Sequence, residues 1–239
     1  MAKVIAINGS PSMKKGNTAI ILDSFIEGTK RDEVEVLYTK RLNIKPCTGD
    51  LNCWYMHPGE CHIQDDMQLI YPKLREAEFL VLATPVYIPL PGEMQNIINR
   101  LCPLIQPLLE TRRGRTSARL HPEIKINTIA LLAVGGWWEK SNFDTVVRIA
   151  KELAQVMSVN FAGAVLRPHA YQMKVNGILT TQGKDILKGV KQAGFELVNE
   201  GKISRRILEA ICRPLISEED LLSKYNESLK KVQSRLALK

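Results

Sequence analysis

The chain has 239 residues, 45% of them hydrophobic and 24% charged, which is typical of a soluble globular protein rather than a disordered or fibrous one. No run approaches the roughly 20 apolar residues of a membrane helix, and the first residues lack the pattern of a secretory signal. These features predict a cytoplasmic protein with no membrane partner. The net charge of +8 would suit a polyanion, but the densest basic run, 112–119, lacks interleaved aromatic residues. We therefore expect a solvated loop there and no nucleic-acid binding, with attraction of an anionic cofactor or partner as the alternative.

Strand and helix patterns alternate along most of the chain. Apolar, β-branched runs predict five strands, at 3–7, 33–38, 79–84, 126–134 and 161–166. Apolar residues spaced by three and four predict helices between and after them, at 18–30, 67–77, 92–110, 142–157 and 180–202. This alternation predicts an α/β protein with a doubly wound, five-stranded parallel sheet and right-handed crossovers.

The chain continues beyond this pattern. We expect one domain over residues 1–203 and a helical C-terminal extension over 204–239. Pro214 and the Ser217-Glu-Glu sequence predict a break followed by a capped helix. An extension of this size is more often packed on its own domain or on a neighbouring subunit than folded as a separate domain.

The loop after the first strand is rich in small and polar residues just before an apolar helix. Hydroxyls and unpaired backbone N–H groups at a helix N-terminus suit a phosphate. The loop has neither the nucleoside-triphosphate nor the dinucleotide glycine pattern, and taken alone it could be a plain turn with Thr18 as a helix cap. The residues concerned are Gly9, Ser10, Ser12, Gly16, Asn17 and Thr18.

Two further loops follow the third and fourth strands. In a sheet of order 2-1-3-4-5, the loop after the third strand lies beside the first loop, where the strand order reverses. A flat heteroaromatic ring needs backbone donors at its edge and apolar or aromatic side chains on its faces. Each aromatic residue taken alone is more often part of the core. The candidates are Pro85, Val86, Tyr87 and Ile88, then Gly135, Gly136, Trp137 and Trp138.

The order of these motifs resembles the NADPH-dependent FMN reductase and iron–sulfur flavoprotein group of the flavodoxin-like superfamily. The resemblance rests on INGSPSMKKGNT, KPCTGDLNCWYMHPGECHIQDDM, ATPVYIPLPGEMQNIINR and VGGWWE. It implies a flavodoxin-like fold and bound FMN. Many relatives carry arginine or lysine at the place of Ser12, and Lys14 or Lys15 could replace that charge. The residues implied are Ser10, Ser12, Asn17 and Thr18 at the phosphate, Pro85, Val86 and Tyr87 along the ring, and Gly135, Gly136 and Trp137 on its other side.

Three of the five cysteines crowd into one segment without a signal peptide, which favours metal or redox chemistry over disulfides. Cys47, Cys53 and Cys61 match the first, third and fourth positions of the group's [4Fe–4S] pattern, but Asp50 occupies the second. The alternatives are a four-iron or three-iron cluster, a zinc site completed by His57 or His62, and no metal, which we prefer.

Five other residues of interest fall outside that pattern. Cys102 and Cys212 lie in apolar helical patterns and are expected in the core or an interface. Asp65 and Asp66 are expected to cap the second helix, rather than to act in catalysis. Trp54 is a candidate for covering the flavin or a subunit contact.

The function implied is that of an FMN-dependent oxidoreductase. It would take electrons from NAD(P)H and pass them to a flavin, quinone or similar acceptor, without a dedicated catalytic side chain. The alternative is an electron carrier that exchanges electrons with a ferredoxin-like partner; a non-redox adaptor remains only if FMN is absent. Relatives are similar in forming homodimers or homotetramers, with the cysteine segment and the tail as candidate contacts. The electron acceptor and the choice between NADH and NADPH stay open.

Overall fold

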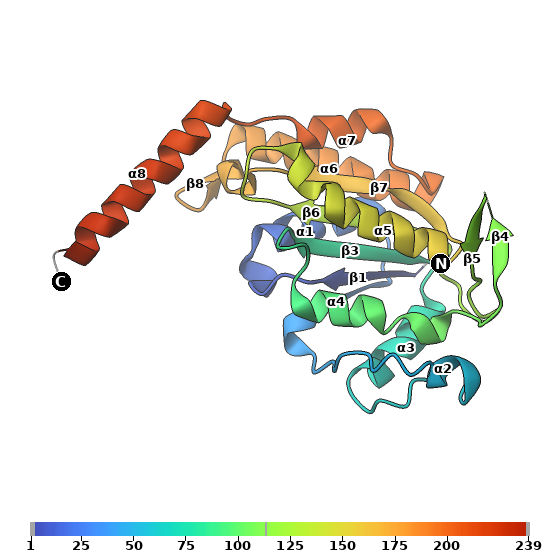
Figure 1. The fold of residues 1–239 in the computed structure, drawn as a ribbon. Coiled ribbons are helices and arrows are strands. Elements are labelled where there is room, and N and C mark those ends of the chain that lie inside the picture. Colours follow the sequence, from blue (N-terminus) through green and yellow to red (C-terminus); the bar gives the residue numbers. More distant parts are fainter. Residues whose placement is uncertain (1–2, 113, 238–239) are drawn as a thin grey trace.

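A five-stranded parallel sheet forms the centre of the computed structural model, which describes residues 3–112 and 114–237 (Figure 1). The strand order is β2-β1-β3-β6-β7, which confirms the predicted order 2-1-3-4-5 and the flavodoxin-like arrangement. All four pairings are parallel. The strands are β1 (Val4–Asn8), β2 (Val34–Tyr38), β3 (Phe79–Pro85), β6 (Thr128–Val134) and β7 (Asn160–Arg167).

Helices cover both faces of this sheet, which explains why its strands are almost continuously apolar. In β1, Ile5 and Ile7 join the core on one face, while Val4 and Ala6 join the core on the other. One face is covered by α3 (Met67–Glu76), α4 (Gly92–Asn99) and α5 (Asp144–Val156). The other is covered by α1 (Asn17–Thr29) and α6 (Thr181–Glu200). Crossovers of this kind bring the loops after β1, β3 and β6 to one edge of the sheet.

The helix expected over 92–110 is wrong beyond its first half. Helix α4 ends at Asn99, and a short 3-10 turn, η3 (Cys102–Leu104), follows it. Pro103 and Pro107 cannot donate the hydrogen bonds that a continuous helix would need. The apolar spacing reflects burial of this turn rather than a helix face.

The basic run is also not a loop. It forms an antiparallel hairpin of β4 (Glu110–Arg112) and β5 (Arg115–Ser117). Arg115 pairs with Glu152 at 2.6 Å, and Arg119 pairs with Glu110. Two of its positive charges therefore face carboxylates of this same chain.

The C-terminal segment divides into two helices that behave differently. Helix α7 (Arg205–Cys212) packs against α6 and β7 through the fully buried Ile211. Helix α8 (Glu218–Ala237) begins after the break at Pro214 and extends away from the sheet (Figure 1). The Ser217 hydroxyl accepts the Asp220 N–H at 3.1 Å, as expected for a helix cap. A domain boundary between residues 203 and 204 stays a prediction.

The remaining elements are short. They are η1 (Met13–Lys15), η2 (Thr39–Arg41), α2 (Asn52–Tyr55), η4 (Lys140–Phe143), η5 (Ala170–Met173), β8 (Lys174–Val175) and β9 (Ile178–Leu179). The β8–β9 hairpin was not predicted, because each strand has two residues. Within 3–112 and 114–237, no helix is both long enough and apolar enough to span a bilayer.

Candidate functional site

A pocket of about 750 Å³ opens at the carboxyl ends of β1, β3 and β6. Its walls come from the loops that follow these three strands, where a doubly wound sheet places its ligands. The structure therefore brings all ten sequence-predicted site residues to one cavity. They are Ser10, Ser12, Asn17, Thr18, Pro85, Val86, Tyr87, Gly135, Gly136 and Trp137.

One end of the pocket is the N-terminus of α1. Gly16 is the N-cap in an extended conformation, so Thr18 is inside the helix and the alternative of a Thr18 cap is wrong. The N–H groups of Asn17 and Thr18 have no acceptor among the described residues. Together with the helix dipole, these unpaired donors favour an anion.

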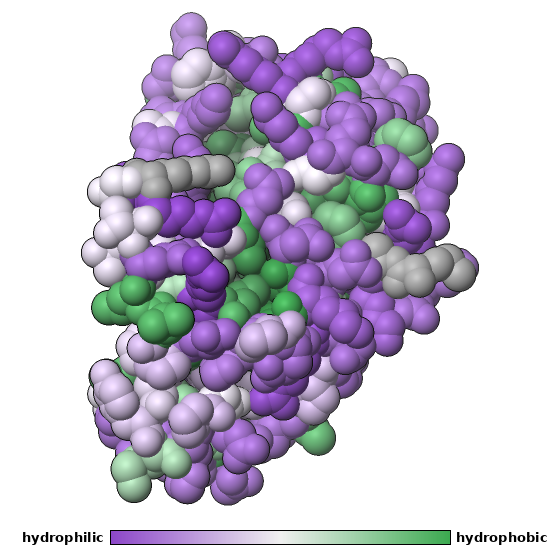
Figure 2. All heavy atoms as spheres, turned by 90° about the vertical axis from the view of Figure 1, so that its right-hand side faces the viewer, coloured by the Kyte–Doolittle hydropathy of each residue, from purple (hydrophilic) through white to green (hydrophobic). Residues whose placement is uncertain are grey.

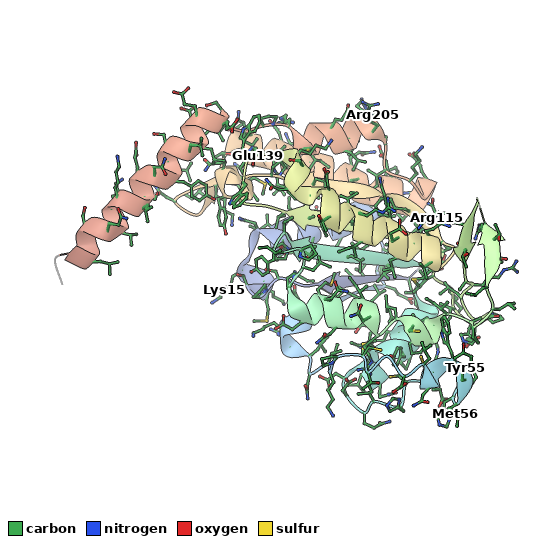
Figure 3. The ribbon with its side chains drawn as sticks, in the orientation of Figure 1. Lys15, Tyr55, Met56, Arg115, Glu139 and Arg205 are labelled. Carbon is green, nitrogen blue, oxygen red and sulfur yellow. The ribbon has the colours of Figure 1, made fainter. Side chains whose placement is uncertain are left out.

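The loop before α1 is held in place by its own side chains. The Ser10 N–H donates to Asn8 Oδ1 at 2.9 Å, and the Ser12 N–H donates to Ser10 Oγ at 3.3 Å. A Cβ at Gly16 would lie 3.0 Å from Ser10 Oγ and 3.0 Å from the Ser12 Cβ, so a larger residue would make these two side chains shift by a few tenths of an ångström. Lys15 lines the pocket beside them, at the left of Figure 3.

The opposite end of the pocket is apolar and aromatic. Tyr87 and Trp137 are 52% and 70% exposed, and Ile88 is also exposed. The expected backbone donors are mostly engaged: the Val86 N–H donates to the Val134 carbonyl at 2.8 Å, and the Tyr87 N–H to the Pro89 carbonyl at 3.0 Å. This loop therefore offers surface for a flat ring more than hydrogen bonds to its edge.

Sequence reasoning missed the pocket residues that come from later elements. Tyr225 of α8 donates its hydroxyl to the Gly136 carbonyl at 3.3 Å, and Tyr171 lies next to it. Burial, and then the neighbouring Tyr171, raise the pKa of Tyr225, so its hydroxyl stays protonated at neutral pH. No signal in the sequence points to Tyr225, because it stands in an ordinary helical pattern. The other missed residues are Asn142, Phe143 and Ala170.

A buried pair at the end of β7 holds the chain between α7 and α8. The Arg167 guanidinium, fully buried, donates to the carbonyls of Ile211 at 2.6 Å and Arg213 at 2.9 Å. His169 Nε2 accepts from Arg167 at 3.1 Å and from the Leu215 N–H at 3.0 Å. Burial, and then the Arg167 charge, lower the pKa of His169 to about 4.

Trp138 belongs to the same anchor and not to the pocket. Its indole N–H donates to the Ile216 carbonyl at 3.0 Å. The neighbouring Trp137 carbonyl accepts the His169 N–H at 2.9 Å. These contacts join the loop after β6 to the tail, and they bring α8 to the pocket.

The segment that carries Cys47, Cys53 and Cys61 lies at the opposite end of the molecule from the pocket. Tyr55, two residues after Cys53, is at the right of Figure 3, whereas Lys15 is at the left. The Trp54 indole N–H donates to the Cys102 carbonyl at 3.2 Å, and Trp54 does not line the pocket of its own chain. Among the described residues, no three His, Cys, Asp or Glu side chains converge closely enough for one metal ion.

Asp65 and Arg100 form a buried ion pair that fixes this segment. Their side chains are 0% and 1% exposed, and Arg100 Nη1 lies 2.7 Å from Asp65 Oδ2. Burial alone would raise the pKa of Asp65, but the Arg100 hydrogen bonds lower it. Asp65 also accepts the N–H groups of Lys45 and of Met67, the first residue of α3, so it joins the start of this helix to the preceding chain. Asp66 occupies the N-cap position, but its side chain accepts the Asn43 N–H and makes no cap hydrogen bond.

A larger hollow of about 1120 Å³ lies between the β4–β5 hairpin and the end of α5. Figure 2 shows this side of the molecule, where hydrophilic side chains surround scattered hydrophobic ones. Its lining includes Arg119, His121 and Lys151 but none of the ten predicted residues. It lies away from the carboxyl ends of the strands, so its size alone does not make it the better candidate.

Comparison with known proteins agrees with the geometry. Residues 2–119 match the family model described as NADPH-dependent FMN reductase. This half of the chain is therefore similar to the NADPH-dependent FMN reductases. An iron–sulfur flavoprotein of Archaeoglobus fulgidus is 36% identical over 41% of this chain and 48% of its own length. One of Methanosarcina thermophila is 30% identical over 41% of this chain and 51% of its own length. Each match spans about half of that relative.

Solved structures share the fold. The NAD(P)H:quinone oxidoreductase from Methanothermobacter marburgensis has a TM-score of 0.55 and 15% identity, over 82% of this chain and all of that one. A flavone reductase also has a TM-score of 0.55, with 19% identity, over 82% of this chain and 62% of that one. At these identities the likeness concerns the flavodoxin-like fold alone.

Proposed function

We propose that the chain binds FMN in the 750 Å³ pocket and is an FMN-dependent oxidoreductase that takes electrons from NAD(P)H. The observation that carries this proposal is the polarity of the pocket. Unpaired N–H groups, hydroxyls and Lys15 stand at one end, and exposed aromatic and apolar side chains stand at the other. A phosphate joined to a flat ring has the same two parts.

At the phosphate end, we assign the anion to Ser10, Ser12, Asn17 and Thr18, with the charge of Lys15 beside them. The donor set suits a phosphate without a fixed guanidinium, because hydroxyls and backbone N–H groups can surround it. Lys15 is the better candidate for the missing basic residue, since it lines the pocket and Lys14 does not.

At the ring end, we assign one face to Pro85, Val86 and Tyr87 and the other to Gly135, Gly136 and Trp137. A bound flavin supplies hydride and single-electron chemistry, so the protein needs to orient it and to control access. Tyr87 and Trp137 are more than half exposed, which leaves aromatic surface on which a nicotinamide or a flat acceptor could stack. This fits a flavin, quinone or similar acceptor.

The second candidate function is an electron carrier that serves a ferredoxin-like partner. The names of the archaeal relatives favour it, because those proteins are described as iron–sulfur flavoproteins.

The free state of all five cysteines supports a reducing compartment, and we propose the cytoplasm.

We also infer that two copies associate through α8. The helix carries exposed apolar side chains at alternating spacings of three and four, the pattern of a coiled-coil seam. Its first turn is acidic at 218–220, and Lys230 and Lys231 follow in its second half, so an antiparallel second copy would match opposite charges. Because Tyr225 of this helix lines the pocket, a partner there would border the flavin. The seam residues are Leu222, Tyr225, Leu229, Val232 and Leu236.

An anaerobic titration tests the function. The purified chain should be yellow or should take up added FMN at one per chain, and NADPH or NADH should bleach it rapidly. Bleaching by a reduced ferredoxin but by neither nicotinamide would favour the carrier. A chain that stays colourless with excess FMN would falsify the flavin proposal.

A further inference from the structure

Four cysteines, not three, line one small cavity beside α2. Cys47, Cys53 and Cys61 come from the segment between β2 and α3, and Cys102 comes from the turn after α4. The fold therefore supplies a cysteine where the local sequence pattern lacks one.

Asp50 is already committed to local contacts. Its carboxylate accepts the Thr48 hydroxyl at 2.6 Å and the Asn52 N–H at 2.9 Å, and it faces His62 at 3.5 Å. These bonds lower the pKa of Asp50 and hold it against Thr48 and the first residue of α2. Asp50 also lines the cavity, but a ligand role would require it to give up these bonds.

We propose that Cys102 completes a four-cysteine site with Cys47, Cys53 and Cys61, and that this site binds a [4Fe–4S] cluster. A cubane ordinarily takes four thiolates, and the relatives' names include iron–sulfur flavoprotein. A cubane also spreads its ligands more widely than one metal ion does. This agrees with four cysteines around one cavity where no three ligands converge on a single point.

A buried cation beside the cavity supports an anionic occupant. Arg100 lines the cavity, its side chain is 1% exposed, and its Nε has no hydrogen-bond partner among the described residues. Asp65 pairs with Nη1 and Nη2 of Arg100, so Nε is the donor left for another acceptor. A cluster with four thiolates is negatively charged, and an arginine donor next to it would stabilise that charge.

Binding requires the cavity to open. It holds about 30 Å³, the space of a single water. Cys47 and the residues around it are exposed, so this stretch can move outward, whereas Cys102 is tied to Trp54. As iron–sulfur bonds form, the four thiols release their protons to solvent. We therefore expect cluster binding to protect this segment from proteolysis.

Anaerobic reconstitution of the full chain with ferrous iron and sulfide tests the proposal. We expect about four irons and four acid-labile sulfides per chain, with a low-temperature electron paramagnetic resonance signal after dithionite reduction. Cys102→Ala should lower the iron and sulfide content at least about twofold and change that signal. Asp50→Ala should keep both, and so should the matched control Cys212→Ala, which removes a cysteine from α7.

Misfolding of Cys102→Ala is controlled by its circular dichroism and by its FMN uptake at the other end of the molecule. The iron and sulfide readout does not depend on FMN, so it can succeed or fail separately from the proposed function. The proposal is overturned if the unmodified chain binds zinc or iron without sulfide, or binds neither. It is also overturned if Cys102→Ala retains the full cluster, or if Asp50→Ala loses as much as Cys102→Ala does.

Discussion

The Tyr225 hydroxyl donates to the Gly136 carbonyl oxygen across 3.3 Å, although 89 residues separate them in the chain. This contact makes the last helix part of the pocket wall. Tyr225→Phe should weaken FMN binding about two- to tenfold, because the free energy of one hydrogen bond is about 0.5–1.5 kcal/mol. Flavin fluorescence titration measures this change.

The matched control is Tyr55→Phe, which removes a hydroxyl from an exposed tyrosine at the other end of the molecule. It should leave the FMN affinity unchanged. Equal FMN affinities for Tyr225→Phe and the unmodified chain would mean that α8 lies near the pocket but does not stabilise its FMN-binding conformation.

Gly16→Ala tests the phosphate end. The new Cβ would meet Ser10 and Ser12 at 3.0 Å, so both side chains would shift by a few tenths of an ångström from the positions proposed to hold the phosphate. We expect FMN affinity to fall about tenfold or more, which corresponds to about 1.4 kcal/mol. The backbone at Gly16 has φ −84° and ψ 161°, which alanine adopts without strain, so the free energy of unfolding should fall by only about 1 kcal/mol, because alanine is a poorer N-cap.

Gly92→Ala is the control for this change, since a Cβ at Gly92 would meet nothing within 4 Å. Isothermal titration with FMN and thermal unfolding of both variants separate binding from stability. Unchanged affinity in Gly16→Ala would contradict the assignment of the phosphate to this loop.

His169 should make the protein sensitive to acid. Its pKa lies near 4 in the folded chain and near 6.5 ordinarily, so the unfolded chain binds the extra proton between these values. The free energy of unfolding should therefore be highest above pH 6.5 and fall by up to about 3 kcal/mol as the pH drops toward 4.

His169→Gln isolates this contribution from that of the carboxylates. A glutamine cannot gain the proton, so urea unfolding should show the stability difference between His169→Gln and the unmodified chain shrinking as the pH falls. His57→Gln, at an exposed histidine, should follow the unmodified chain. Parallel pH profiles for all three proteins would refute the role of His169.

Self-association through α8 predicts that Leu229→Glu separates the copies. A charge in the middle of the apolar seam should weaken the dimer at least about tenfold. Sedimentation velocity measures this, and raising the salt concentration should act in the same direction, because exposed opposite charges are screened. Ser234→Ala, off the seam, is the control. A monomeric unmodified chain at every concentration would exclude the contact.

The sequence was sufficient for the alternation of strands and helices and for the turn from β1 into α1, because both depend on local patterns, whereas the strand order came with the family resemblance. Ser10 to Thr18 form one continuous turn into a helix, so their proximity follows from chain order alone. The helix expected over 92–110 failed because a buried turn with two prolines has the same apolar spacing as a helix. Cys102 and Tyr225 were missed for another reason: tertiary contacts bring them to their sites, and those contacts leave no mark in the neighbouring residues.

The anchor at Arg167 and His169 has one further consequence. Their side chains bind the carbonyls of Ile211 and Arg213 and the N–H of Leu215, which belong to the main chain and are the same in every residue but proline. The tail is therefore recognised by its path and scarcely by the identity of its side chains. A different helix could be joined after Ile216 and would still begin beside the pocket. This position is therefore a suitable junction for engineered fusions.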